Sequence, residues 1–84
     1  MAQDYEQLRV QLAENIRWMR RVKNLTQEQL ALMAEVDRTY VSQIERSTGN
    51  PSLMVLCKLA NILGITTDQL LIDPSALQQM LHVE

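Results

Sequence analysis

Apolar residues recur at three- and four-residue steps through much of the chain, which is the spacing of one face of an α-helix. The first such stretch runs from Tyr5 to about Lys23, and its repeating positions are Leu8, Leu12, Ile16 and Met19. Asp4, with Gln7 three residues later, can cap the start of this helix. Asn24 follows where a left-handed residue often ends a helix, so one long amphipathic helix is predicted here.

Two short helices are predicted next. Thr26 and Gln29 form a capping box that starts the first of them at Gln27. Its expected buried stripe comprises Leu30, Ala31, Met33 and Ala34. The pattern breaks at Glu35, and Asp37 is a good cap for the second helix. The spaced apolar positions of the second helix are Tyr40, Val41 and Ile44.

A turn-rich linker over residues 47–52 separates these helices from a fourth. Ser52 can cap a helix from Leu53 to about Leu63, and Gly64 can end it. The core stripe predicted for this helix is Leu53, Leu56, Leu59, Ala60 and Leu63.

The last part of the chain predicts two more helices. Thr66 and Gln69 form another Thr-x-x-Gln box, which starts a short helix containing Leu70 and Leu71. A final helix follows at about 74–82, with Pro74 suited to its first turn. It carries the apolar residues Leu77, Met80 and Leu81. Their apolar side needs a cover, either within the chain or on a second subunit, and we favour the second subunit.

The two helices in the stretch 27–46 meet across about three residues, which is the spacing of a helix-turn-helix motif. The stretch resembles the core of the lambda-repressor-like, or xenobiotic-response-element (XRE), family of bacterial and phage transcription factors. The matching positions are Gln27, Ala31, Val36, Val41, Ser42, Ile44 and Glu45. Glu35 stands where the family usually has Gly. The backbone at this position tends to positive φ, which costs a non-Gly residue roughly 1 kcal/mol.

The resemblance covers about residues 12–72 and implies an all-α, five-helix DNA-binding fold, to which the helix at 74–82 is a short extra element. We expect residues 1–84 to form a single helix-turn-helix domain. The resemblance also implies a partly buried ion pair between Arg20 and Glu45, which fixes how the first helix lies against the third.

Length and composition fit this interpretation. The 84 residues contain no Phe, so the core must consist mostly of aliphatic side chains and Met. The single cysteine, Cys57, excludes an internal disulfide and is expected to pack within its helix. With neither a membrane-length apolar run nor a signal-peptide pattern, a cytoplasmic protein is expected. The lone histidine, His82, is expected at the surface, and no metal site or cofactor is predicted.

The formal net charge of −2 at first argues against a nucleic-acid partner. Residues 17–58, however, carry seven basic against four acidic side chains, and local charge governs attraction to phosphates. A cluster of Arg17, Arg20, Arg21 and Lys23 is either a phosphate surface or a solvated helix end. On the same helix, Trp18 and Val22 lie off the main stripe and are expected to pack under a terminal segment.

Residues at the start of a recognition helix reach base edges. The expected base readers are Arg38, Thr39, Tyr40 and Gln43. Arg can grip guanine, Gln can pair with adenine, and Thr offers its methyl to thymine. The expected phosphate contacts are Gln27, Arg46, Arg17, Asn50 and Ser52.

The predicted function is sequence-specific binding of double-stranded DNA by a homodimeric transcription regulator at an inverted repeat. The DRTYVS, IER and NP segments are also similar to controller proteins of restriction-modification systems, although a phage-type repressor fits too. An alternative is an antitoxin-type interaction module that binds DNA only to regulate itself. An enzyme is disfavoured, since the chain has no Gly-rich phosphate loop and no nucleophile paired with a base. No small-molecule effector is expected, because we expect these residues to form no second domain that could hold one.

Overall fold

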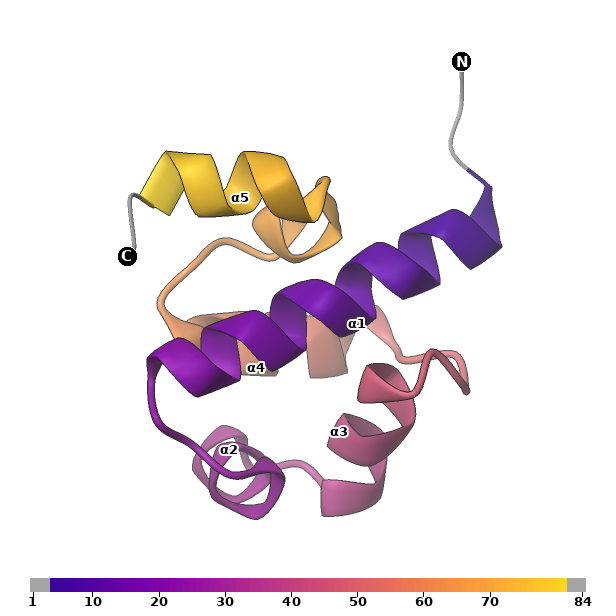
Figure 1. The fold of residues 1–84 in the computed structure, drawn as a ribbon. Helices are drawn as coiled ribbons and strands as arrows, with labels where there is room; N and C mark the ends of the chain where they lie inside the picture. The colour runs from indigo at the N-terminus through magenta and orange to yellow at the C-terminus, as the bar shows by residue number, and fades with distance from the viewer. Residues whose placement is uncertain (1–3, 82–84) are drawn as a thin grey trace.

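The computed structural model describes residues 4–81, and within that range every regular element is helical. The elements are α1 (Tyr5–Val22), α2 (Gln27–Ala34), α3 (Arg38–Glu45), α4 (Leu53–Leu63), the 3-10 helix η1 (Asp68–Leu71) and α5 (Pro74–Leu81). Helix α1 crosses the middle of the molecule. Helices α2 and α3 lie on one side of it, and α5 lies on the other (Figure 1). The predicted all-α, lambda-repressor-like fold is confirmed, with a 3-10 helix in place of the fifth α-helix.

The predicted helix starts are confirmed by their side-chain caps. An oxygen of Asp4 accepts from the Gln7 N–H at 2.7 Å. Thr26 and Gln29 form both halves of the capping box, at 3.0 and 2.8 Å. Because each cap satisfies an amide that the first turn would leave unpaired, the local sequence fixes where these helices begin.

The predicted helix ends are also confirmed. Asn24 adopts a left-handed φ of 56° just past Lys23, the C-cap of α1, and Gly64 adopts 78° at the end of α4. The Leu25 N–H then bonds back to the Arg20 carbonyl at 2.9 Å, and the Ile65 N–H bonds to the Ala60 carbonyl at 3.2 Å. These are the six-to-one hydrogen bonds of the Schellman motif, in which a left-handed residue ends the helix.

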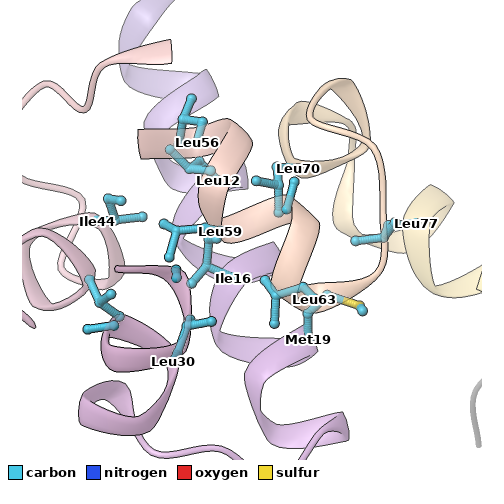
Figure 2. Packing of buried hydrophobic residues seen from close by; sticks show 14 residues of the cluster. Leu12, Ile16, Met19, Leu30, Ile44, Leu56, Leu59, Leu63, Leu70 and Leu77 are labelled. Carbon is cyan, nitrogen blue, oxygen red and sulfur yellow. The ribbon is translucent and has the colours of Figure 1, made fainter. Parts of the chain in front are cut away.

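One hydrophobic core joins all six elements (Figure 2). Its fully buried side chains include Ile16, Leu30, Val41, Leu59, Leu63, Leu70 and Leu77. Two predicted core positions are wrong, since Met33 is 54% exposed and Leu53 is 70% exposed. The buried residues of α2 are Leu30, Ala31 and Ala34, and those of α4 begin at Leu56, one turn after Leu53.

The short helix predicted after Thr66, with Leu70 and Leu71, is present as the four-residue 3-10 helix η1. Gln69 Oε1 accepts from the Thr66 N–H at 2.9 Å, but the Gln69 N–H bonds to the Thr66 backbone carbonyl at 3.1 Å. Buried Asn15 on α1 donates to the carbonyls of Leu70 and Ile72 at 2.9 and 2.8 Å. Since these carbonyls are bonded across to α1, the segment is held as a tight turn without a longer helix.

The final helix packs against α1 and buries Leu77 completely inside the protomer. Leu77 is therefore a core residue and offers no side chain to a second subunit. Leu81 is half-buried, whereas Met80 is 54% exposed. Within residues 4–81 no helix has the length and apolar character needed to cross a membrane. His82 lies outside the described residues.

Three other side chains singled out from the sequence have different outcomes. Trp18 is half-buried and packs against the core, whereas Val22 is 37% exposed. Cys57 is exposed, so its predicted helix packing is wrong, and its sulfur accepts from the Thr67 hydroxyl at 3.3 Å. The described part of the chain brings no group of three or more metal-ligating side chains together.

Candidate nucleic-acid interface

The turn between α2 and α3 sets the direction in which α3 leaves the core. Glu35 adopts a left-handed φ of 57°, as predicted, and the Val36 N–H bonds to the Ala31 carbonyl at 3.0 Å. Asp37 then caps α3, with its carboxylate accepting from the Thr39 N–H at 2.8 Å. This hydrogen bond lowers the pKa of Asp37. The stability that the cap contributes is therefore fully present above the ordinary pKa of an Asp, and it is lost as the pH falls through the lowered pKa.

Helix α3 presents one polar edge outward. Arg38, Thr39 and Tyr40 are exposed, and Gln43 is half-buried one turn later. The opposite edge of α3 carries Val41 and Ile44, which are buried in the core. An open hollow of about 370 Å³ lies along the outer edge and is lined by Arg38, Thr39, Ser42 and Arg46. The helix therefore has the supported inner face and accessible outer face that a groove-reading helix needs.

Gln43 lies against the linker that follows α3. Its backbone carbonyl accepts from the Thr48 N–H at 2.9 Å and from the Thr48 hydroxyl at 3.1 Å. Gly49 has a φ of 74°, and a Cβ there would come 3.1 Å from Gln43 Oε1. A side chain at position 49 would therefore crowd the amide of a candidate base reader as well as strain the backbone.

A buried carboxylate joins the first three helices. Glu45, whose side chain is 4% exposed, accepts from Arg20 Nε at 2.7 Å and from Arg20 Nη2 at 2.9 Å. Gln27 donates to the same carboxylate at 3.2 Å. Arg20 also donates to the Leu25 carbonyl at 2.9 Å, and its carboxylate partner raises its pKa. The paired, bidentate geometry fixes the orientation of α3 against α1.

The candidate phosphate contacts fall into two groups. Arg17 and Gln27 are half-buried and already bonded within the chain, since Arg17 Nη1 donates to the Glu45 carbonyl at 3.1 Å. Arg46, Asn50 and Ser52 are exposed. Ser52 caps α4 by accepting from the Val55 N–H at 3.1 Å. The exposed group is better placed to meet a nucleic-acid backbone.

Sequence patterns missed two residues that touch this surface. The Tyr5 hydroxyl and the Arg9 guanidinium, both on α1, reach the backbone of the linker after α3. The sequence did contain one feature that could have drawn attention to them. Tyr5 stands four positions before Arg9 on one helix, a spacing at which the two side chains meet. Nothing in that local pattern indicates a partner forty residues away.

A helix-turn-helix with an exposed second helix, built on an all-α core, defines the class of DNA-binding transcription regulators. The chain belongs to the helix-turn-helix family HTH_3, the XRE type, which matches residues 16–70. This is a family of transcription regulators and not of enzymes.

Relatives and solved structures agree with this assignment. The chain is 44% identical over 71 residues to a hypothetical transcription factor of Neisseria meningitidis serogroup B, which covers 84% of this chain and 67% of the relative. It is 43% identical over 60 residues to the control protein C.SmaI of Serratia marcescens, 71% of each chain. The crystal structure of the transcription factor NHTF from Neisseria superposes with a TM-score of 0.80 at 40% identity, covering 95% of this chain and 93% of that one. The restriction-modification controller protein C.AhdI from Aeromonas hydrophila gives 0.70 at 39% identity, covering 74% and 94%.

Proposed function

We propose that this regulator binds an inverted-repeat operator in double-stranded DNA as a homodimer, with α3 of each subunit in the major groove. The observation that carries the proposal is the exposure of Arg38, Thr39 and Tyr40 at the start of a helix whose other face is buried. In helix-turn-helix proteins the first residues of the second helix contact base edges.

The chemistry of these side chains suits a mixed operator. The Arg38 guanidinium can pair with O6 and N7 of a guanine through two parallel hydrogen bonds. The Gln43 amide can pair with N6 and N7 of an adenine, and the Thr39 methyl can contact a thymine. Tyr40 lines a small hollow with Gln43 and Asn50, at the border between the base-reading edge and the linker.

The DNA backbone is assigned to the residues that follow α3. Arg46 carries a positive charge at the end of the hollow that Arg38 also lines. Asn50 offers an amide donor, and the 11-residue α4 begins at the end of the same linker, so its positive dipole end favours a phosphate there. These contacts would set the register of α3 without reading the sequence.

A second subunit is proposed to pack on α5. Met80 is 54% exposed on this helix, whereas the neighbouring Leu77 is fully buried inside the protomer. Two subunits related by a twofold axis would place two recognition helices about one DNA turn apart, which is the geometry that an inverted repeat matches. The relatives named as control proteins are of similar length, and C.SmaI aligns over 71% of each chain.

Selection of binding sites from a random duplex pool, combined with the mass of the selected complex, tests the proposal. We expect two half-sites in inverted orientation, centred roughly 10 base pairs or a multiple of that apart, and two protein chains per duplex. Enrichment of one half-site by a single chain would contradict the homodimer. Failure to enrich any duplex at low ionic strength would contradict operator binding itself.

Arg46→Ala is expected to weaken binding to the selected operator and to random DNA by the same factor. Arg46 is exposed and lies past the base-reading turns, so its charge should act on a phosphate. The slope of log affinity against log salt should fall by about one unit. Lys58→Ala is the matched control, because Lys58 lines a separate hollow with Met33 and Ile62. A loss confined to the operator would show that Arg46 reads bases.

Met80→Asp is expected to raise the dimer dissociation constant by about tenfold or more, because a carboxylate buried in an interface loses its hydration. Sedimentation equilibrium of the free protein measures this change. The fold should be unaffected, since Met80 is exposed in the protomer. Gln79→Asp adds the same charge at the adjacent exposed position and serves as the control. An unchanged constant for Met80→Asp would place the subunit contact elsewhere.

A further inference from the structure

The first two turns of α1 hold the linker between α3 and α4 at a single atom. The Tyr5 hydroxyl donates to the Gly49 carbonyl oxygen at 3.1 Å, and Arg9 Nη1 donates to the same oxygen at 3.2 Å. A carbonyl oxygen has two lone pairs, so these two donors satisfy it fully. Residues 40 and 44 positions apart in the chain are thus joined by a pair of directed hydrogen bonds.

The two donors are held in place by contacts within α1. Arg9 Nη2 donates to both carboxylate oxygens of Glu6, at 3.0 and 2.8 Å. The Arg9 guanidinium carbon lies 5.0 Å from the centre of the Tyr5 ring, within the range of a cation–π contact. We call Tyr5, Glu6 and Arg9 the α1 clamp. These contacts favour the arrangement in which both donors reach the Gly49 carbonyl.

At its start the linker is bonded to the end of α3, since the Thr48 N–H and hydroxyl both donate to the Gln43 carbonyl. Ser47 and Gly49 both have positive φ, at 57° and 74°, so two of the first three linker residues are in the left-handed region. Behind the linker lies an apolar hollow of about 130 Å³, which is lined by Leu8, Leu12, Pro51 and Leu56 among others. Side-chain packing therefore leaves space under this segment, and the clamp supplies the hydrogen bonds that hold the Gly49 carbonyl from the α1 side.

The position of the Gly49 backbone affects the residues on both sides of it. Asn50 follows it directly and is exposed, and Ser52 opens α4 two residues later. On the other side, the Gly49 backbone lies against the Gln43 side chain. We propose that Tyr5 and Arg9 are positioning residues for DNA binding, which fix the linker so that Asn50 and the first amides of α4 meet a phosphate. This inference rests on the proposed function and adds to it a part of α1 that lies before the family match.

Tyr5→Phe tests the clamp, because it removes one hydroxyl from a half-exposed ring and leaves the ring itself in place. Operator affinity should fall about three- to tenfold, the equivalent of one hydrogen bond. The salt slope should stay unchanged, since the effect passes through a neutral amide. Amide exchange at Gly49 and Asn50 in the free protein should become faster. Gln7→Ala, at an exposed position in the same turn, is the control and should change none of these.

A double-mutant cycle separates positioning from a general structural role. If Tyr5 acts through Asn50, Tyr5→Phe should cost less in an Asn50→Ala background than in the wild type. Additive losses, or a salt slope lowered by about one unit in Arg9→Met, would overturn the inference, the latter because Arg9 would then touch a phosphate itself. Full affinity in Tyr5→Phe would overturn it while leaving the proposed function intact. Wild-type protein that selects no duplex would instead overturn both.

Discussion

Replacing Glu45 with Gln is expected to lower the free energy of unfolding by about 2 kcal/mol and to weaken operator binding as well. The substitution keeps the volume of the side chain but removes the charge that faces Arg20, whose own side chain is 16% exposed. Breaking a buried ion pair from one side costs about 3–5 kcal/mol, and the remaining amide oxygen can still accept one of the Arg20 bonds, which reduces the loss. Urea unfolding followed by circular dichroism measures it.

The DNA-binding part of this prediction follows from where the carboxylate sits. Glu45 ends α3, and through it Arg20 of α1 and Gln27 of α2 are tied to that helix. A weakened tie lets α3 rotate against the core and spreads the directions in which Arg38 can point. Binding must then order α3 as well, and the free-energy cost of this ordering lowers the affinity for DNA.

Two variants sharpen the test on Glu45. Glu14→Gln removes an exposed carboxylate from α1 and should leave the unfolding midpoint unchanged. Replacing both Arg20 and Glu45 with Met should cost less than removing the carboxylate alone, because no buried charge is then left without a partner. Equal midpoints for Glu45→Gln and the wild type would show that the ion pair contributes neither stability nor orientation.

Local features of this fold could be predicted because their causes are local. The caps at Asp4, Thr26 and Ser52 act within three residues of the chain, and each starts a helix where predicted. The left-handed turn at Glu35 could also be placed, because both the pattern break and the family resemblance indicate the same position.

Features that depend on a distant partner could not be predicted from local patterns, and the Arg20–Glu45 ion pair was expected only because the family resemblance implies it. The spacing of Met33 and Leu53 fits an apolar stripe, but only the packed neighbours decide how wide each stripe is. The 3-10 turn at 68–71 depends on Asn15, whose amide reaches carbonyls more than fifty residues away. The contact of Arg9 with Gly49 is of the same kind. A single sequence carries the donor and the acceptor but not their pairing.

Arg38→Ala is expected to cost about 1–3 kcal/mol against the selected operator, which is roughly a five- to 150-fold loss of affinity. The guanidinium is exposed at the first residue of α3, next to the Asp37 cap that fixes the helix start, so it should pair with one guanine in each half-site. Affinity for random DNA should fall far less, because little of the lost interaction is with phosphates. Titration of operator and random duplexes at one fixed salt concentration measures both losses.

The base preference at one position of the half-site provides the sharper test of Arg38. With the wild type, changing the contacted guanine should cost about as much as the Arg38→Ala substitution, and in the variant the same base change should cost little. Arg38→Lys keeps the charge but loses the two parallel hydrogen bonds, so it should restore binding to random DNA more than discrimination between bases. Equal losses on operator and random duplexes from Arg38→Ala would mean that this side chain contacts the backbone, and that base reading starts later on α3, at Thr39 or Gln43.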